Sequence, residues 1–368
     1  MLKVGLAGAR SLSTLLGFRA IAGVEVTAIC DLNADLVERV SRENGIPRAY
    51  RVFEDMLEAD IDAVVVATPM QHHVPQALAA LEAGKHVLSE VTAAVTMDEL
   101  WWLIEAVEKS GKVYMLAENY CYTPEVQLVG SLVRKGLLGE VYYGEGEYLH
   151  DIRDLAVYPN GKTSWRSYWQ LGKRGAFYPT HSVGPVMQWF ADDRISSLCT
   201  LGSGRHMSQT LRQDDTTVTL LQLESGKLAR IRVDCMSPRP HNMAYYQLQG
   251  TKGCYEAPRG MGDDHKIWLE GYDRWQPLMG LREHLPERFR QATDEQSAAG
   301  HGGGDFFIVQ DFVDAVTKGA KSAIDVYQAA EWTAVALLSE LSVTNGGRMM
   351  DMPRFRKNMP YGEQRVKL

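Results

Sequence analysis

The 368-residue sequence lacks a long apolar run, an excess of basic residues and any close pairing of its few cysteines. Its longest uncharged apolar stretch, around residues 63–70, is far shorter than the roughly 20 residues that span a bilayer, so no transmembrane helix is expected. The five cysteines are scattered and never spaced as Cys-x-x-Cys, which excludes a disulfide framework and a zinc ribbon. The net charge of −7 provides no field for a polyanion, so nucleic acid is not an expected partner.

The chain also begins without a charged and then apolar leader, because Met1 and Leu2 lead directly into a β-rich run and a glycine turn. We therefore expect a cytoplasmic protein. Apolar residues make up 45% of the chain and charged residues only 23%, which indicates one large or two ordinary folded domains. No two histidines have a convincing acidic or histidine partner at metal-ligand spacing, so no metal site is predicted.

The first third alternates short β-rich runs with helical patterns, as βαβ units on a parallel sheet do. Strands are predicted at 3–7, 25–30, 62–67, 86–89 and 113–117, and helices at 34–43, 71–83 and 97–109. The last helix is the clearest, because Thr96 and Glu99 form a capping box ahead of apolar residues at helical spacing. Residues 1–121 are therefore predicted to form an α/β domain with a doubly wound parallel sheet.

From residue 122 the pattern changes to that of an α+β domain with an open antiparallel sheet. A helix is predicted at 125–135, and period-two alternation predicts strands at 140–150, 216–223, 228–233 and 244–250. The charged, glycine-rich stretch 283–304 is expected to be an exposed loop, followed by helices at 306–318 and 326–344. Residues 122–368 are therefore predicted to form this second domain.

The turn after the first predicted strand consists of Gly8, Ala9, Arg10, Ser11, Leu12 and Ser13. A dinucleotide-binding turn would read Gly-x-Gly-x-x-Gly, and only its first glycine is present. The position of the turn is stronger evidence: it follows an N-terminal strand, and Asp31 closes the second strand about 20 residues later. That carboxylate would bind the ribose and repel a 2′-phosphate, so this Rossmann-type site favours NAD over NADP. The alternative is that Asp31 caps the next helix.

Three further segments carry a resemblance to a known family: TPMQHH at 68–73, AGKHVLSE at 83–90 and GHGGGDF at 300–306. Together they resemble the Gfo/Idh/MocA oxidoreductases over essentially the whole chain. Most of that family carries Glu-Lys-Pro after the fifth strand, and the lysine reaches the nicotinamide and the substrate. This sequence has Glu90, Val91 and Thr92 there instead.

The missing lysine points to a subgroup of that family. The segments that match it are ENYCY at 118–122, WR at 165–166, YPTH at 178–181, GP at 184–185, SPRP at 237–240, DVY at 325–327 and AEW at 330–332. They resemble the NAD-dependent glycosidases of glycoside hydrolase family 109, which also lack the lysine. The resemblance implies NAD as cofactor, a sugar or glycoside substrate and a homo-oligomer. It also implies that residues 122–368 bind the substrate, carry the catalytic residues and mediate oligomerisation.

The resemblance, and for His150 its position at the end of a predicted strand, indicate which residues form the site. The cofactor-binding residues are expected to be Gly8, Ala9, Arg10, Ser11, Leu12, Asp31, Thr68, Pro69, His72, Glu90 and Asn119. The substrate-binding residues are expected to be His150, Trp165, Arg166, Arg239 and His301. We expect His72 and His73 to cap the next helix near the cofactor. A structural turn is an equally good interpretation of His150, and a glycine loop such as that of His301 can occur without function.

Tyr178 and His181 are the most informative pair in the second half. Pro179 suits the first position of a helix, and positions three apart lie on one helix face, so phenol and imidazole would project side by side. Such a pair can exchange a proton with a sugar hydroxyl or a carbon acid, and the nearby cations Lys173 and Arg174 would favour phenolate. The alternative is a buried tyrosine packed under a helix N-terminus beside a hydrogen-bonded histidine.

These residues fit two classes of function, an enzyme and a binding protein. As an enzyme, the protein could be a redox-neutral glycosidase, which would oxidise sugar C3 with NAD, remove the acidified C2 proton, expel the C1 group, add water and reduce the ketone again. It could also be a plain sugar dehydrogenase, which would stop after the oxidation and release NADH. As a binding protein, it would be a sensor that holds NAD and does no chemistry. The presence of both Tyr178 and His181 favours an enzyme, and the missing lysine favours the glycosidase.

Overall fold

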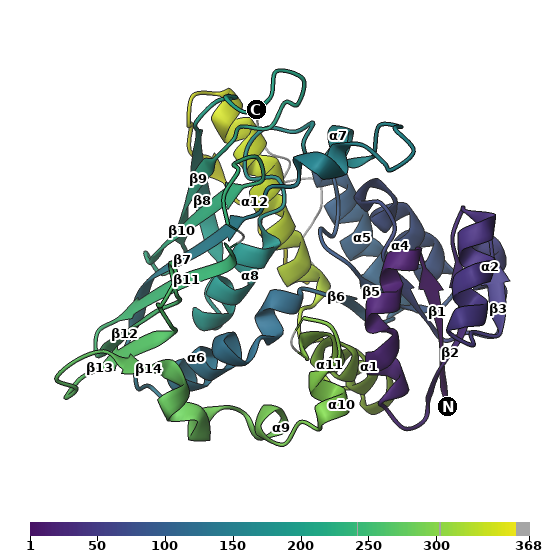
Figure 1. Cartoon of the computed structure of the whole chain (residues 1–368), viewed down its shortest axis with the longest axis horizontal. Coiled ribbons are helices and arrows are strands. Elements are labelled where there is room, and N and C mark those ends of the chain that lie inside the picture. The colour runs from purple at the N-terminus through teal and green to yellow at the C-terminus, as the bar shows by residue number, and fades with distance from the viewer. Residues whose placement is uncertain (241, 302, 358–368) are drawn as a thin grey trace. The chain divides into compact units, whose positions relative to one another are not determined.

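The computed structural model describes residues 1–240, 242–301 and 303–357. The chain forms two compact units, which can be followed by colour in Figure 1. The first contains Met1–Tyr122, Ala292–Ala330 and the described residues from Phe355 onward, and the second contains Thr123–Gln291 and Glu331–Arg354. The segment from Ala292 to Ala330, which includes His301, therefore packs with the N-terminal third of the chain.

The sheet of the first unit is parallel throughout, as predicted. Its strands are β1 (Leu2–Ala7), β2 (Val24–Cys30), β3 (Arg48–Tyr50), β4 (Ala63–Val66), β5 (His86–Ser89) and β6 (Tyr114–Leu116). They lie in the order β3-β2-β1-β4-β5-β6. The order reverses direction between β1 and β4, and ligands of such sheets bind outside the carboxyl ends of the strands at this switch point.

The helices of this unit are α1 (Leu15–Arg19), α2 (Ala34–Glu43), α3 (Phe53–Leu57), α4 (His73–Glu82), α5 (Met97–Ser110), α10 (Asp294–Ser297) and α11 (Gly304–Lys318). Of these, α1, α2, α3 and α4 contact strands of the sheet. α4 packs against α5, and α1 packs against α11. The predicted capping box of Thr96 and Glu99 is present at the start of α5. Every residue of β4 is fully buried, as expected for a parallel strand covered on both faces.

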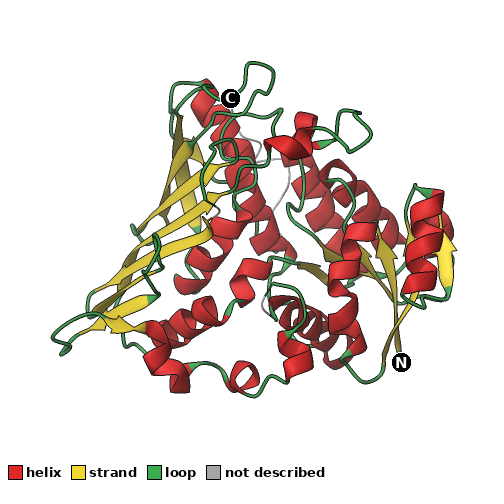
Figure 2. Ribbon diagram, viewed as in Figure 1, coloured by secondary structure: helices red, strands yellow, loops and turns green. Residues whose placement is uncertain are grey.

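The second unit contains a larger sheet, drawn in yellow in Figure 2. Its strands are β7 (Val141–Leu149), β8 (Ile195–Gly202), β9 (Thr217–Leu223), β10 (Leu228–Asp234), β11 (Asn242–Gly250), β12 (Gly253–Glu256), β13 (Lys266–Leu269), β14 (Gln276–Pro277) and β15 (Met350–Asp351). Their order is β14-β13-β12-β11-β7-β10-β9-β8-β15. The predicted antiparallel sheet is confirmed with one exception, because β7 and β10 pair in parallel.

The helices of this unit are α6 (Pro124–Arg134), α7 (Arg166–Trp169), α8 (Thr180–Trp189), α9 (Glu287–Arg290) and the part of α12 (Val326–Thr344) from Glu331 onward. The expected loop at 283–304 is thus interrupted by two short helices, α9 and α10. Threonine capping explains α10, because Thr293 and Gln296 form a capping box at its start. In the described part of the chain, no helix is long and apolar enough to cross a membrane.

Two glycines of β7 allow α8 to lie directly on the sheet. A Cβ atom at Gly146 would lie 2.6 Å from the Ser182 carbonyl oxygen, and one at Gly144 would lie 3.0 Å from Val186. Because side chains alternate along a strand, Tyr148 points to this same face, whereas Glu145 and Glu147 point to the opposite face. The helix that carries His181 is therefore held against the strand that carries Tyr148.

Candidate active site

The first residue of the predicted glycine turn has to be a glycine. Gly8 has φ of +83°, and a Cβ atom there would lie 2.6 Å from the Ala67 carbonyl oxygen. In place of further glycines, the buried Ser11 hydroxyl donates to the Gly8 carbonyl at 2.5 Å, and the Thr14 hydroxyl donates to the Ser11 carbonyl at 2.7 Å. Arg10 is exposed. The missing side chain at Gly8 therefore lets the turn lie directly against the backbone that follows β4.

Asp31 lies at the end of β2 and joins this strand end to the turn. Its carboxylate accepts the Ala9 amide at 3.0 Å and the Asn33 amide at 3.0 Å. The cap of α2 is Asn33, whose side chain accepts the Leu36 amide, so the interpretation of Asp31 as a helix cap is wrong. The carboxylate remains half-buried at the edge of the sheet where the ribose of a dinucleotide would be bound.

The loop after β4 is held by His73, one of the two histidines expected to cap the next helix. His73 is buried, and its two ring nitrogens lie 2.8 Å from the Thr68 and Thr92 carbonyl oxygens, while burial lowers its pKa. His72 is exposed and occupies the N-cap position of α4, but its side chain makes no capping hydrogen bond, so the predicted capping holds for the position of His72 and not for its side chain. Pro69 precedes the short turn that leads into α4. His73 therefore ties together two loops at the carboxyl edge of the sheet.

Asn119 and Glu90 follow the last two strands of the same edge. The Asn119 side-chain oxygen is buried without a hydrogen-bond donor among the described residues. Buried polar atoms are normally satisfied, so this oxygen fits a donor from a bound group such as a carboxamide. The next residue after Glu90 is Val91, which is 5% exposed, so no cation stands at the position of the family lysine.

His301 belongs to the first unit and has a carboxylate partner. Its Nδ1 lies 2.9 Å from Asp305, which is almost fully buried at the start of α11. This contact raises the pKa of His301, the charge of Glu90 raises it further, and the charge of Arg10 lowers it. The hydrogen bond to Asp305 is the largest of these effects on the pKa of His301.

In the second unit, Tyr178 and His181 lie in contact. Their ring centroids are 5.0 Å apart and the rings are nearly perpendicular, at 85°. The predicted helix face is not the reason: α8 begins at Thr180, Pro179 precedes its first residue, and Tyr178 lies outside it with φ of +104°. The expected proximity is therefore achieved by an unusual backbone conformation at Tyr178.

His181 is placed by a proline four residues further along α8. Pro185 has no amide hydrogen and cannot donate to the His181 carbonyl, as residue i+4 of a helix normally does. The buried Tyr246 hydroxyl donates to this carbonyl instead, at 2.5 Å. A side chain of β11 therefore anchors the first turn of α8 beneath the His181 imidazole.

Tyr148 completes the cluster and was not predicted. Its ring centroid lies 5.7 Å from that of Tyr178 and 5.1 Å from that of His181. Its hydroxyl lies 2.8 Å from Nδ1 of His150, which was predicted. The signal was available, since strand alternation places residues 148 and 150 on the same face. Tyr148, His150, Tyr178 and His181 form what we call the aromatic cluster.

The remaining predicted residues lie in loops or short helices of the second unit. The Arg166 guanidinium lies 4.3 Å from the Trp165 ring centroid and donates to Gln170 at 2.9 Å. Arg239 is exposed. Lys173 contacts Glu340 at 3.4 Å, and Arg174 contacts the buried Asp214 at 2.8 Å. The cations expected to favour the Tyr178 phenolate are thus each paired with a carboxylate.

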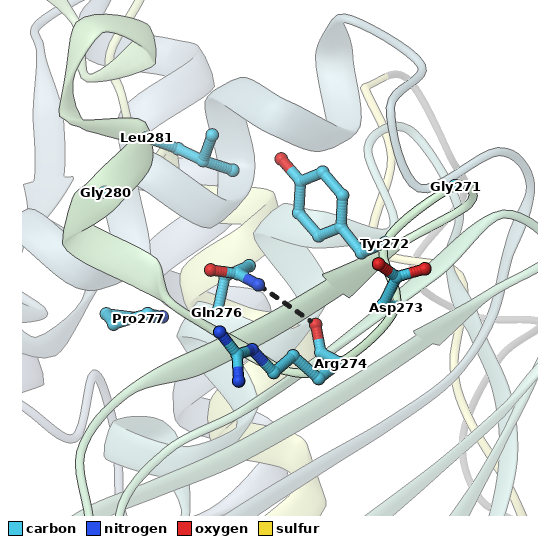
Figure 3. A pocket seen from close by; sticks show the side chains of 8 residues that line it. All are labelled: Gly271, Tyr272, Asp273, Arg274, Gln276, Pro277, Gly280 and Leu281. Atoms are coloured by element: carbon cyan, nitrogen blue, oxygen red, sulfur yellow. Dashed lines mark hydrogen bonds between the residues drawn. The ribbon is translucent and has the colours of Figure 1, made fainter.

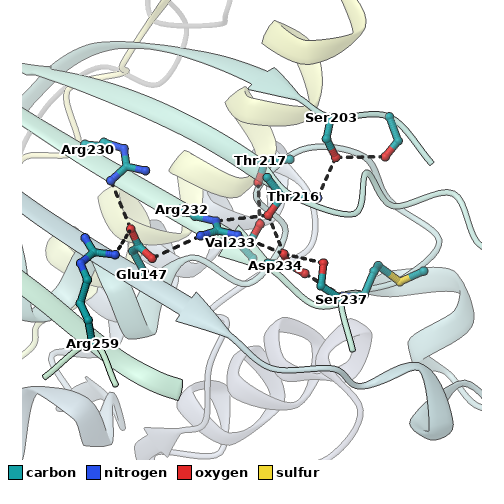
Figure 4. A network of polar contacts seen from close by, with 12 residues as sticks. Glu147, Ser203, Thr216, Thr217, Arg230, Arg232, Val233, Asp234, Ser237 and Arg259 are labelled. Atoms are coloured by element: carbon teal, nitrogen blue, oxygen red, sulfur yellow. Dashed lines mark hydrogen bonds and ion pairs between the residues drawn. The ribbon is translucent and has the colours of Figure 1, made fainter. Parts of the chain in front are cut away.

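A polar network covers the other face of β7, as Figure 4 shows. Glu147 is nearly buried and is approached by Arg230 at 3.2 Å, Arg232 at 3.6 Å and Arg259 at 3.7 Å. In the same network, Asp234 accepts the Ser237 amide at 2.9 Å and its hydroxyl at 2.8 Å. The Asp234 backbone carbonyl accepts the His150 amide at 2.9 Å. Asp234 thus fixes both His150 and the start of the segment that carries Arg239.

A separate pocket of about 610 Å³ lies beside β13 and β14, and Tyr272, Arg274 and Gln276 are among the residues that line it (Figure 3). None of the predicted site residues lines this pocket. Over the described residues, no group of three or more histidine, cysteine, aspartate or glutamate side chains is arranged to hold a metal ion.

The sheet order, the glycine turn and Asp31 define an NAD-binding protein of the oxidoreductase type. The profile described as "Oxidoreductase family, NAD-binding Rossmann fold" matches residues 2–118. The profile described as "Glycosyl hydrolase 109, C-terminal domain" matches residues 122–213 and 202–360. The chain belongs to glycosyl hydrolase family 109, within the Gfo/Idh/MocA oxidoreductases, and is an NAD-dependent enzyme.

Two curated relatives extend over almost the whole chain. A glycosyl hydrolase family 109 protein of Saccharopolyspora erythraea is 33% identical and covers 96% of this chain and 83% of its own. An alpha-N-acetylgalactosaminidase of Shewanella oneidensis is 31% identical, with 95% of this chain and 83% of its own covered.

Solved structures resemble the fold at lower identity. A levoglucosan dehydrogenase in complex with NADH has a TM-score of 0.81 at 21% identity, covering 96% of this chain and 99% of its own. An Agrobacterium radiobacter oxidoreductase in complex with NAD+ has a TM-score of 0.74 at 17% identity, with 95% and 98% covered. At these identities the likeness establishes the fold alone.

Proposed function

We propose that the protein is a redox-neutral glycosidase that uses NAD. The observation that carries the proposal is the contact of the Tyr178 and His181 rings, 5.0 Å apart, in a chain that has the buried Val91 in place of a lysine. Without that ammonium, proton transfer depends on the phenol and the imidazole. A glycosidase of this type needs such groups, because it must break a C2–H bond as well as an O–H bond.

Three features of the first unit would hold the cofactor: the turn at Gly8, Asp31 at the end of β2 and the buried side-chain oxygen of Asn119. Backbone at Gly8 would lie against the pyrophosphate, Asp31 would accept from the ribose hydroxyls, and Asn119 would accept from the carboxamide. When bound, NAD supplies the chemistry of withdrawing hydride from sugar C3 and returning it at the end. Asp31 also disfavours a 2′-phosphate by charge repulsion, which makes NADP a poor substitute.

The aromatic cluster would handle the protons. Tyr178 and His181 take the C3 hydroxyl proton and, once C3 is a ketone, the acidic C2 proton. Loss of the C2 proton expels the C1 substituent, which leaves with a proton. Water then adds at C1, a proton returns to C2 and the C3 ketone is reduced again. Tyr148 and His150, whose side chains lie 2.8 Å apart, belong to the same cluster and would contact the sugar.

Aryl glycosides provide the direct test, beginning with 4-nitrophenyl α-N-acetylgalactosaminide because a relative is named for that activity. We expect release of the aryl group without net accumulation of NADH, and deuterium at C2 of the sugar produced in D2O. Stoichiometric NADH with a keto-sugar and no aryl release would establish a plain sugar dehydrogenase instead.

Two variants test the assignment of the pair. Tyr178→Phe removes one hydroxyl, and His181→Ala removes the imidazole, so each should lower turnover by about 10²- to 10⁴-fold. The NAD content of the purified protein should stay unchanged, because both residues belong to the second unit. Near-full activity in both variants would mean that the pair is structural. Homo-oligomerisation and a cytoplasmic location stay predictions.

A further inference from the structure

Tyr178 has a backbone conformation that a tyrosine seldom adopts. Its φ of +104° lies in the region that favours glycine, and bulky residues stay there only when the surrounding structure imposes it. The residue that follows is Pro179, and the phenol is the group assigned to proton transfer. What holds the preceding backbone therefore decides where this phenol lies.

Asp214 holds that backbone from one side. Its side chain is fully buried, and its two carboxylate oxygens accept from Arg174 Nη2 at 2.8 Å and Nε at 3.1 Å. The same carboxylate accepts the Gly175 amide at 3.4 Å. A paired, bidentate carboxylate of this kind orients its partners more rigidly than a single hydrogen bond does.

The helix α12 holds the same backbone from another side. The Ser339 hydroxyl accepts the Ala176 amide at 2.8 Å. A Cβ atom at Gly175 would lie 2.6 Å from that hydroxyl oxygen and 2.7 Å from the Glu340 amide nitrogen, so backbone packs on backbone here. Ala176 and Phe177 are fully buried. The three residues before Tyr178 are thereby confined.

We infer that Asp214 is a positioning residue for Tyr178: through Arg174 and Gly175 it imposes the backbone conformation that directs the phenol at His181. The inference rests on the proposed function, in which Tyr178 transfers protons. If the buried ion pair were merely structural, its loss would lower stability, and the effect on turnover would not depend on the Tyr178 hydroxyl. This dependence can be measured.

The measurement is a double-mutant cycle of Asp214→Asn with Tyr178→Phe, using the 4-nitrophenyl glycoside that the enzyme turns over. Asp214→Asn keeps the size of the side chain and removes its charge. It should lower kcat by about 10- to 100-fold, since small misplacements of a reacting group have effects of this size, and should leave KM and NAD content nearly unchanged. In the Tyr178→Phe background it should cause almost no further loss.

Glu145→Gln is the matched control, because Glu145 is a nearly buried carboxylate paired with Arg230 at 2.7 Å on the face of β7 away from α8. It should leave kcat close to the wild-type value. Equal losses from Asp214→Asn in both Tyr178 backgrounds would overturn the inference. Full activity of Tyr178→Phe alone would instead overturn the proposed function.

A second readout does not depend on activity. Crystal structures of the wild-type protein and of Asp214→Asn give φ of residue 178 directly, and we expect it to leave the positive region in the variant. An unchanged positive φ would overturn the inference. If Asp214→Asn does not fold, Arg174→Lys carries the same tests, because lysine keeps the charge pair but cannot make the two-nitrogen contact.

Discussion

From the hydrogen bond between Tyr246 and the His181 carbonyl we predict how much stability the protein loses when this bond is removed. Tyr246→Phe removes only the hydroxyl, which is the hydrogen-bond donor to the buried His181 carbonyl. This carbonyl has no donor from its own helix, because Pro185 lacks an amide hydrogen. Loss of the partner of a buried polar group costs about 1–3 kcal/mol. In a unit of this size, each kcal/mol lowers the melting temperature by about 2–4 °C.

Pro185→Ala provides the control, because an alanine there returns the amide hydrogen that a regular helix would donate to the His181 carbonyl. The melting temperatures of the wild type, both single variants and the double variant should be measured by calorimetry at one protein concentration. We expect the destabilisation caused by Tyr246→Phe to shrink to a small part of its value in the Pro185→Ala background. The same decrease in both backgrounds would refute the view that the tyrosine compensates for the proline.

Three further predictions concern the first unit. Gly8→Ala should abolish measurable NAD binding in a calorimetric titration, because its Cβ atom would lie 2.6 Å from the Ala67 carbonyl oxygen and would force the turn to change shape; an unchanged affinity would contradict the role of this turn in binding the cofactor. Asp31→Ala should weaken NAD binding by about 1–3 kcal/mol and improve the relative affinity for NADP, as the loss of a charge-assisted contact implies. Asp305 raises the pKa of His301 above its value in the unfolded chain, where it is about 6.5. The contact therefore stabilises the fold fully at pH values below about 6.5, and this stabilisation is lost as the pH rises through the raised pKa of the folded state. The melting-temperature difference between the wild type and Asp305→Asn should therefore be larger at acidic than at alkaline pH, and a constant difference would exclude the linkage.

The first unit was predictable because its signals are local. The strands, the capping box at Thr96 and the position of Asp31 each depend on residues close together in the chain. The short strand β3 and helix α3 escaped prediction, since three to five residues provide too little periodicity. The segment from Ala292 to Ala330 could not be assigned to this unit from sequence, because nothing local in it specifies which distant residues it packs against.

Three of the four residues of the aromatic cluster were predicted, but the helical spacing used to pair Tyr178 with His181 does not explain their contact. Tyr178 and His181 were paired by helical spacing, whereas the observed contact depends on the positive φ of Tyr178 and on groups such as Asp214 that lie far along the chain. Tyr148 could have been found from strand alternation once His150 was considered. The parallel pairing of β7 with β10 had no sequence signal, because period-two alternation is the same for both strand directions.

That parallel pair has a consequence for how the enzyme folds. Two parallel strands cannot be joined by a tight turn, and here β7 ends at Leu149 while β10 begins at Leu228, so the pair closes a long loop that includes Tyr178 and His181. Contacts that close long loops form slowly, whereas the antiparallel neighbours β8, β9 and β10 follow one another along the chain. The amide of His150, which donates to the Asp234 carbonyl across this pairing, should be among the last to gain protection from hydrogen exchange during refolding. The chain would therefore form the local pairings of β8, β9 and β10 before it acquires an assembled centre for proton transfer.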